Sequence, residues 1–381
     1  MAEAFIAGAV RTAIGKRNGG LAGVHPVDLG AHAVRALVDR TGVDPGAVDD
    51  VIMGCVSQIG PQTFDIARNA WFSAGLPESV PGVTVDRQCG SSQQAVHFAA
   101  QGVMSGTQDL VVAAGVESMS VVTMGSTVAL PAKAGMPLPW GQGWRERYGD
   151  QEISQFRGAQ LMCEKWDLKR SQLEEFSLES HQRAIRAIDE GRFEREIAPL
   201  AGVSQDEGPR RDTSLEKMAG LAPLREGWEI TAAVSSQISD GAGALLIASE
   251  AALDRYGLTP RARVHALAVV GADPVMMLAG PIDATRKVLA KAGMAVTDID
   301  VVEINEAFAP VVLAWSDELE APLERTNPNG GAIALGHPLG ATGSILMTKL
   351  VHELERTGGR FGLQTMCEGG GQANATIIER V

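Results

Sequence analysis

Cysteine is scarce in this chain, and its spacing excludes several classes of protein. Only four cysteines occur among 381 residues, and no two of them form a CxxC pair. A structural zinc site needs closely spaced ligands, and disulfide frameworks are typical of short secreted chains. We therefore expect free thiols, no metal site and a cytoplasmic protein. The four cysteines are Cys55, Cys89, Cys163 and Cys367.

Long apolar runs are also missing. No run approaches the roughly 20 residues of a membrane-spanning helix. The first residues, Met1-Ala2-Glu3-Ala4-Phe5, show no basic segment followed by an apolar core, which would mark a secretory signal. We expect neither membrane insertion nor secretion.

Positive charge is in short supply as well. The formal net charge is -13, and the sequence pI is about 5.1. Such an acidic chain argues against nucleic acid as a partner. With 45% hydrophobic and 21% charged residues, the composition is that of an ordinary globular protein. An anionic ligand would therefore need basic residues gathered locally around it.

Strand and helix signals alternate along both ends of the chain. This alternation predicts an α/β fold, with a mixed or parallel sheet covered by helices. The expected strands are 5–10, 51–56, 82–85, 110–114, 264–270, 301–304, 363–366 and 376–378. The expected helices are 27–41, 63–74, 91–104, 281–292, 307–319 and 343–354.

Two similar segments indicate an internal duplication. Residues 240–247 and residues 371–378 share a pattern of small residues followed by aliphatic ones. We expect two related halves, the first formed by residues 1–118 with 240–259 and the second by residues 260–381.

The segment between the halves, residues 119–239, differs in character and is predicted to be an insertion. It contains an amphipathic helix over 171–190, with Ser171 as its cap and Glu174 three residues later. Its basic residues form a candidate anion-binding surface, although any one of them is more often a solvated charge. These residues are Lys165, Lys169, Arg170, Arg210, Arg211 and Lys217.

Cys89 is the first candidate catalytic residue. It follows an expected strand and precedes an expected helix that Ser91 or Ser92 can cap. A thiol at a helix N-terminus feels partial positive charge, which lowers its pKa, and nearby backbone N–H groups could hold an oxyanion. Because an isolated cysteine is more often inert core, this assignment needs partners.

Three further motifs supply such partners. His337 lies in a glycine-rich stretch over 330–343, Cys367 precedes three glycines, and Asn305 ends a strand. Singly, each fits an ordinary turn or strand end equally well. However, the segments of Cys89, Asn305 and Cys367 all end strands, where an α/β sheet places its active site. Cysteine with histidine indicates an activated nucleophile, and a second cysteine suits proton transfer at a carbon beside a carbonyl.

These motifs resemble those of the thiolase family, and the resemblance runs nearly end to end. It includes Gln88-Cys89-Gly90-Ser91-Ser92, Asn305-Glu306-Ala307-Phe308, Gly336-His337-Pro338 and Cys367-Glu368-Gly369. The resemblance implies a five-layered α-β-α-β-α fold of two halves with an inserted loop domain at residues 119–239. It also implies a homodimer or homotetramer, coenzyme A as co-substrate, and no bound metal or prosthetic group.

The resemblance also implies roles for single residues. Cys89 would become acylated, His337 would activate it, Asn305 would hold a water, and Cys367 would be the acid/base at the α-carbon. The backbone N–H groups of Cys89 and Gly369 would form an oxyanion hole. The expected coenzyme A contacts are Ser236, Ala307 and Phe308 at the pantetheine arm, and Arg210 or Arg211 at the adenosine phosphates.

Three departures from the family pattern affect this reading. Ala233-Val234 replaces Gly-Asn before the pantetheine serine. Glu368 stands where a small or apolar residue is common, and a buried charge there would raise the pKa of the cysteine beside it. Ser154-Gln155 replaces the His-Met that biosynthetic acetoacetyl-CoA thiolases carry over the acyl group, which favours the degradative type.

The predicted reaction is cleavage of a 3-ketoacyl-CoA by CoA into acetyl-CoA and a shortened acyl-CoA. The nearest alternative is an acetoacetyl-CoA thiolase restricted to the four-carbon substrate. A decarboxylating ketosynthase is disfavoured because Asn305 stands where that relative has a second histidine. An alternative of another class is a non-catalytic acyl-CoA-binding protein, which would be expected to have lost Cys89, His337 or Cys367.

Overall fold

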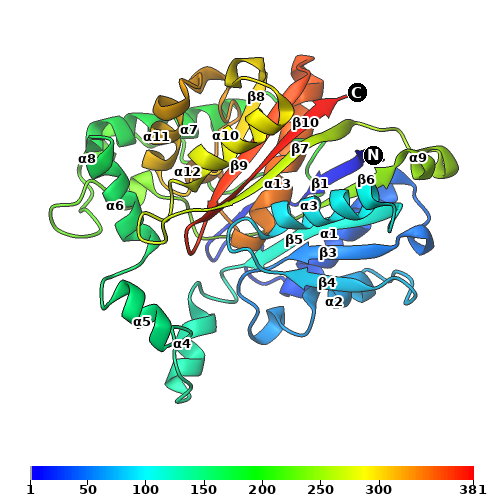
Figure 1. The fold of residues 1–381 in the computed structure, drawn as a ribbon, viewed down its shortest axis with the longest axis horizontal. Coiled ribbons are helices and arrows are strands. Elements are labelled where there is room, and N and C mark those ends of the chain that lie inside the picture. Colours follow the sequence, from blue (N-terminus) through cyan, green and yellow to red (C-terminus); the bar gives the residue numbers. More distant parts are fainter. Residues whose placement is uncertain (1) are drawn as a thin grey trace.

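Each half of the chain builds a mixed β-sheet of similar strand order, and the two are joined edge to edge into one ten-stranded sheet (Figure 1). The structure, a computed structural model, describes residues 2–381. The first half contributes β1 (Ala4–Arg11), β2 (Gly15–Lys16), β3 (Asp50–Gly54), β4 (Gly82–Val85), β5 (Leu110–Ser118) and β6 (Ser239–Ser249). The second half contributes β7 (Ala262–Gly271), β8 (Val301–Ile304), β9 (Phe361–Glu368) and β10 (Gln372–Arg380).

The pairing of the strands shows the duplication. In the first half β3 runs parallel to β4 and β5, and β5, β6 and β1 are antiparallel neighbours. In the second half β8 runs parallel to β9, and β9, β10 and β7 are antiparallel neighbours. Strands β3, β5, β6 and β1 thus correspond to β8, β9, β10 and β7. The halves join where Phe5 and Ile6 of β1 pair with Arg263 and Ala262 of β7.

Helices form three layers around the two sheets. Helices α1 (Pro26–Thr41) and α2 (Ile66–Ser73) cover the outer face of the first sheet. Helices α3 (Ser91–Ser105) and α13 (Thr342–Thr357) pack against each other between the sheets. Helices α10 (Gly280–Ala292) and α11 (Ala309–Leu319) cover the second sheet. The five-layered arrangement is therefore confirmed. The short α9 (Glu250–Tyr256) links the halves.

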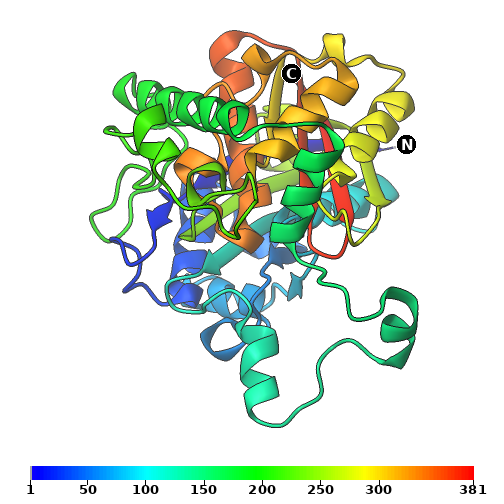
Figure 2. The same ribbon diagram turned by 90° about the vertical axis from the view of Figure 1, so that its left-hand side faces the viewer.

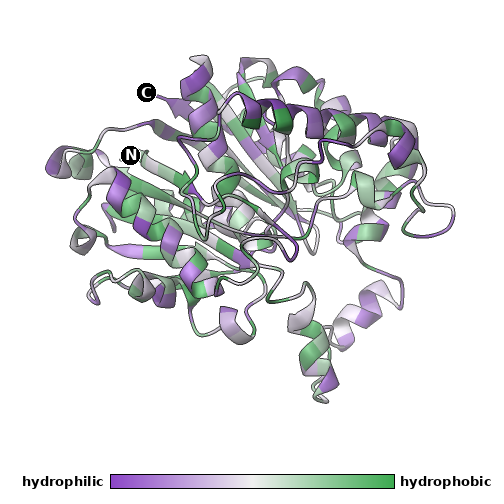
Figure 3. Cartoon of the chain, turned by 180° about the vertical axis from the view of Figure 1, so that it is seen from behind, coloured by the Kyte–Doolittle hydropathy of each residue, from purple (hydrophilic) through white to green (hydrophobic). Residues whose placement is uncertain are grey.

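Burial on both faces explains the composition of the central strands. All residues of β5 and β6 are buried, and both strands consist mainly of small and aliphatic residues without polar alternation. Such strands are typical of a sheet covered by helices on both sides. Figure 3 shows the same distribution, with apolar residues on the strands and hydrophilic residues on the outward helix faces.

The segment between β5 and β6 contains helices and no element of the sheet. Its helices are α4 (Ser126–Lys133), α5 (Gln142–Tyr148), α6 (Gln155–Lys165), α7 (Arg170–Asp189) and α8 (Leu215–Ala219). Helices α6 and α7 pack on α11, and α7 also contacts α12 (Ala332–Leu335). Helices α4 and α5 extend away from the body and bury no residue (Figures 1 and 2). The division into halves and insertion, with the bounds given above, remains our proposal.

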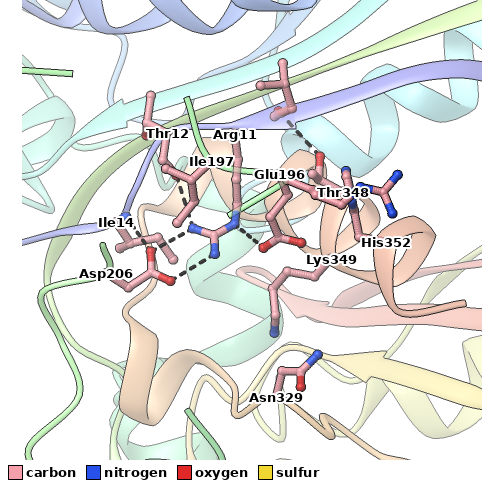
Figure 4. Close-up of polar contacts among 12 residues, drawn as sticks. Arg11, Thr12, Ile14, Glu196, Ile197, Asp206, Asn329, Thr348, Lys349 and His352 are labelled. Atoms are coloured by element: carbon pink, nitrogen blue, oxygen red, sulfur yellow. Dashed lines mark hydrogen bonds and ion pairs between the residues drawn. The ribbon is translucent and has the colours of Figure 1, made fainter. Parts of the chain in front are cut away.

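A buried ionic cluster ties this segment to β1 (Figure 4). Arg11 donates to Glu196 over 2.7 Å and to both carboxyl oxygens of Asp206 over 2.7 and 2.9 Å. Asp206 also accepts the backbone N–H of Ile14 over 2.7 Å. Arg11, Glu196 and Asp206 are all buried, so each charge depends on its partners. The cluster therefore fixes the chain just before Arg210.

Several details of the expected helices are wrong. Helix α2 begins at Ile66 rather than at 63. Helix α7 begins at Arg170 after Lys169, not after a Ser171 cap, and Glu174 binds Arg170 instead of the cap. The Gln172 side chain accepts the N–H of Lys169 over 2.8 Å and satisfies the helix start. No helix within residues 2–381 is long and apolar enough to cross a lipid bilayer.

Candidate active site

Cys89 lies on a sharp turn between β4 and α3. Gln88, just before it, has φ of 48°, a left-handed conformation that is uncommon outside glycine. The Ser91 hydroxyl stabilises this turn, because it accepts the N–H of Arg87 over 2.9 Å and donates to the Gln88 carbonyl over 2.6 Å. The turn presents Cys89 directly at the start of α3.

The expected serine cap of α3 is wrong. Gly90 is the cap residue, and no side chain caps this helix. Ser91 is used for the turn, and Ser92 accepts the backbone N–H of Ser344 in the first turn of α13 over 2.8 Å. A Cβ on Gly343 would overlap the backbone of Gln93. The N-termini of α3 and α13 are therefore in direct contact.

Two backbone groups face the Cys89 sulfur. The N–H groups of Cys89 and Gly369 act to lower its pKa. Cys89 is partly exposed, whereas the other three thiols are buried, and all four cysteines are free. Burial, followed by the charge of Glu368, raises the pKa of Cys89 to about 12. The expected lowering by the helix N-terminus is therefore wrong for the resting site, and the thiol needs a base to ionise.

Cys367 is the penultimate residue of β9 and lies beside Cys89. Burial and then the charge of Cys89 raise the pKa of Cys367 well above its ordinary value. At neutral pH Cys367 is consequently a protonated thiol. A buried thiol next to the nucleophile can supply a proton to an atom held between them.

His337 lies in the loop between α12 and α13, after Gly336 with φ of 111°. Its Nδ1 is 2.6 Å from the Thr342 hydroxyl, which itself donates to the Pro338 carbonyl over 3.0 Å. Because that hydroxyl proton is used, His337 must donate from Nδ1, which leaves Nε2 as an acceptor. Burial lowers the pKa of His337 to about 4, so the ring is a neutral base.

Asn305 faces this base. It follows β8, and its Nδ2 lies 3.4 Å from Nε2 of His337. Its backbone N–H donates to Thr365 of β9 over 3.1 Å, which places it at the same sheet end as Cys367. The Asn305 Oδ1 is buried and has no hydrogen-bond partner within residues 2–381. A buried orphan oxygen of this kind is the type of group that binds an ordered water.

A cleft of about 890 Å³ leads to His337. Of the residues expected to contact coenzyme A, it is lined by Ser236, Phe308, Arg210 and Arg211. Ala307 is not in the lining, but its carbonyl accepts the N–H of Ser236 over 2.9 Å and so positions that serine. Cys89, Cys367 and Asn305 also lie outside the lining.

Sequence reasoning found Phe308 but missed the rest of the apolar wall of the cleft. This wall is formed by Met119, Met124, Phe156, Leu339 and Phe308, and the rings of Phe156 and Phe308 meet edge to face with centroids 5.8 Å apart. Of the expected pair over the acyl group, Gln155 lines the cleft, whereas Ser154 caps α6 by accepting the N–H of Arg157. Phe156, directly after Gln155, was the one signal available in the sequence.

The expected anion-binding surface is mostly neutralised. Arg211 pairs with Asp189 over 2.5 Å, and Lys217 pairs with Asp212 over 2.8 Å. Lys169 and Arg170 also have carboxylate partners, and Lys165 lies over the Trp166 ring. Arg210 has no ion-pair partner within residues 2–381, and its backbone N–H donates to His181 over 3.1 Å. Arg210 is therefore the better candidate for a phosphate contact.

Comparisons with known proteins agree with this geometry. The thiolase N-terminal domain model matches residues 4–251, and the thiolase C-terminal domain model matches residues 258–380. The chain is 60% identical over 387 residues to the steroid 3-ketoacyl-CoA thiolase FadA6 of Mycobacterium tuberculosis, covering 100% of this chain and 95% of that one. It is 42% identical over 403 residues to a beta-ketoadipyl-CoA thiolase of Escherichia coli, with 100% of both covered.

Solved structures show the same relationship. Human mitochondrial 3-ketoacyl-CoA thiolase in complex with CoA superposes with a TM-score of 0.90 at 36% identity, covering 100% of this chain and 98% of that one. The Bacillus anthracis acetyl-CoA acetyltransferase gives a TM-score of 0.89 at 35% identity, with 100% and 99% covered. The chain therefore belongs to the thiolase family of acyltransferases.

Proposed function

We propose that this protein cleaves 3-ketoacyl-CoA with free CoA, giving acetyl-CoA and an acyl-CoA shortened by two carbons. One observation supports this most directly. A partly exposed cysteine, Cys89, faces two backbone N–H groups and lies beside a second protonated thiol, and its helix α3 contacts α13, which follows the neutral base His337. Simple thioester hydrolysis does not require the second thiol, whereas breaking a carbon–carbon bond next to a carbonyl does.

In the first half-reaction, His337 Nε2 accepts the proton of Cys89, and the sulfur attacks the 3-keto carbon. The attacked carbon becomes bonded to Sγ, so the N–H groups of Cys89 and Gly369 that face Sγ are suited to its oxyanion. The bond between C2 and C3 then breaks, and acetyl-CoA leaves as an enolate. Cys367 donates its proton to the α-carbon.

In the second half-reaction, the CoA thiol attacks the acyl group on Cys89. The thiol proton passes to the Cys367 thiolate left by the first half-reaction. The Cys89–acyl bond breaks to release the shortened acyl-CoA, and protonated His337 returns its proton to the Cys89 sulfur. The site thereby returns to its starting protonation state. During the first half-reaction, His337 with a water on Asn305 Oδ1 is suited to polarising the thioester oxygen of the departing acetyl-CoA.

For coenzyme A we propose the cleft beside His337. Ser236, Ala307 and Phe308 would hold the pantetheine arm, and Arg210 or Arg211 the phosphates. Acidic side chains also line this cleft, and Arg211 already forms an ion pair. The unpaired Arg210 therefore supports this assignment better than Arg211.

For the acyl group we propose a longer or bulkier chain than acetoacetyl. The apolar wall of Met119, Met124, Phe156 and Leu339 supports this, as does the 60% identity to a thiolase named for steroid 3-ketoacyl-CoA. Thiolysis rates over a series of 3-ketoacyl-CoA lengths test the proposal. We expect longer substrates to react at least as well as acetoacetyl-CoA, and strict preference for the four-carbon substrate would favour the alternative instead.

We also propose that the protein acts in degradative lipid metabolism, in the cytoplasm, as a homodimer or homotetramer. The names of the relatives support the metabolic role. Light scattering of the purified protein distinguishes the two oligomers, and a monomer would contradict both.

A further inference from the structure

Glu368 ends β9 directly after Cys367, and the reaction proposed above gives it no task. Its side chain is completely buried, and neither carboxyl oxygen has a hydrogen-bond partner within residues 2–381. An ionised carboxylate buried without a partner is strongly unfavourable. The surroundings therefore select the neutral acid.

The carboxyl group of Glu368 lies against the residue that caps α3. A Cβ on Gly90, the cap of α3, would overlap Glu368 Oε1 and would lie 3.0 Å from Asn374 Nδ2. Asn374 Nδ2 donates to the Gly90 carbonyl over 3.3 Å, and its Oδ1 is buried without a partner. In its neutral form, Glu368 carries a hydroxyl donor beside Asn374, whose buried Oδ1 has no donor within residues 2–381.

The charged and titratable groups around Glu368 do not neutralise it. From the Cys89 turn, Arg87 favours ionisation and Asp86 opposes it, but Arg87 donates to Gln372 of β10 over 3.0 Å and not to either Glu368 oxygen. Cys89 is the other titratable group of the turn, and Cys367 is the one on β9. On β10, Gln372 and Asn374 present uncharged amides here, and on α3 the titratable His97 contacts the Thr376 hydroxyl over 2.7 Å. Burial, supported by Asp86, raises the pKa of Glu368 to about 8.

We propose that Glu368 is a positioning residue for Cys89: its neutral acid braces Gly90 at the start of α3, and its ionisation suppresses the Cys89 thiolate. The inference rests on the proposed role of Cys89 as nucleophile. The negative charge of Glu368 is, after burial, the largest influence that raises the Cys89 pKa. The protein would therefore work with Glu368 protonated and lose reactivity as that carboxyl ionises.

Two interacting acids leave a characteristic signature in a pH profile. The alkylation rate of a thiol far below its pKa rises about tenfold per pH unit, because the rate follows the thiolate fraction. When Glu368 ionises near pH 8, its charge raises the Cys89 pKa, so the rate should stop rising over that interval. A like charge nearby shifts a pKa by at least about one unit, which corresponds to a tenfold rate difference.

The test measures iodoacetamide alkylation of Cys89 by peptide mass mapping between pH 6 and 9.5. We expect the wild-type profile to flatten near pH 8 and that of Glu368→Gln to keep rising. The two rates should agree below pH 7, diverge above pH 8 and differ by about tenfold near pH 9.5. Glu379→Gln is the matched control, because it removes a carboxylate at the opposite end of β9 and β10 and should follow the wild type.

Profiles of wild type and Glu368→Gln that run parallel at all pH values would overturn the proposal, whether they coincide or differ by a constant factor. If Glu368→Gln does not fold, Glu368→Ala serves as the second variant with the same expected divergence. Alkylation requires no catalytic turnover, so this result is independent of the proposed reaction. Failure of thiolysis with an intact pH signature would refute the proposed function and leave the pairing of Glu368 with Cys89 in place.

Discussion

Cys89 and Cys367 are the same residue type in adjacent positions, yet their surroundings suit them to different steps. Cys89 is partly exposed and faces two backbone N–H groups, whereas Cys367 is fully buried beside it. Acetyl exchange between CoA molecules through Cys89 breaks only carbon–sulfur bonds. Thiolysis in addition requires a proton at the α-carbon, which is the task proposed for Cys367.

Substitution separates the two roles. Cys367→Ala should lower thiolysis about 10²–10⁴-fold, the usual cost of losing a positioned general acid, while acetyl exchange falls much less. Cys89→Ala should abolish both. Labelled-CoA exchange beside an absorbance assay of 3-ketoacyl-CoA loss measures this, with circular dichroism as the check on folding. Equal loss of both activities in folded Cys367→Ala would show that Cys367 merely supports Cys89.

Glu368 should also make the unfolding free energy depend on pH. Its pKa is raised by burial to about 8 in the folded protein, against about 4.5 when unfolded. Between these values the folded state binds the extra proton, so its contribution to stability is complete below about pH 4.5 and falls as the pH rises towards 8. The slope approaches about 1.4 kcal/mol per pH unit.

Glu368→Gln should remove this slope. The difference in unfolding free energy between the variant and the wild type, measured by urea denaturation, should therefore increase in favour of the variant from pH 5 to pH 8. A difference independent of pH would mean that Glu368 is ionised, or already satisfied, in the folded protein.

At the scale of helices and strands, a buried ion cluster holds the segment between β5 and β6 against β1. Asp206→Asn leaves Arg11 buried with less compensation, so we expect about 3–5 kcal/mol lower unfolding free energy. Because the cluster also fixes the chain before Arg210, KM for CoA should rise more than kcat falls. Asp167→Asn is the control, since its exposed pair with Lys169 should contribute little. Unchanged stability of Asp206→Asn would contradict the role of the cluster.

The contact between α3 and α13 is equally specific. A methyl group on Gly343 would meet the backbone of Gln93, so Gly343→Ala should cost about 1–3 kcal/mol and lower thiolysis by moving the Cys89 and His337 elements apart. Gly271→Ala adds the same methyl group where nothing lies within 4 Å and should change neither quantity. Thermal unfolding and initial rates compare the pair. Equal behaviour of both variants would show that the helix N-termini can separate without consequence.

Sequence reasoning was wrong about the caps of two helices, α3 and α7. The cap proposed for α3 failed because Ser91 and Ser92 form turn and tertiary contacts. The cap proposed for α7 failed because Glu174 pairs with Arg170 four residues earlier in the same helix. Periodicity locates helices but does not decide which nearby group takes each hydroxyl. By contrast, strands β4 and β8 were predicted with correct bounds, since short β-branched runs between turns are unambiguous there.

For the whole molecule, the duplication explains why the sequence reveals the site better than the cleft. Cys89, Asn305 and Cys367 each stand at the carboxyl end of an expected strand. They could therefore be assigned to one end of the sheet from the sequence. The cleft wall combines Met119, Phe156, Phe308 and Leu339 from separate segments without a shared pattern. In the Arg11 cluster, likewise, the two acidic partners lie 185 and 195 positions further along the chain than Arg11. No local sequence pattern predicts such pairs.

The central claim is that Cys89 carries the acyl group between the two half-reactions. Incubation with acetyl-CoA in the absence of free CoA, followed by acid quench and peptide mass mapping, tests it most directly. We predict one acetyl group per chain on Cys89, removed on addition of CoA, and none in Cys89→Ala. An unmodified Cys89 in active protein, or acetyl on Cys55, Cys163 or Cys367 instead, would contradict the account.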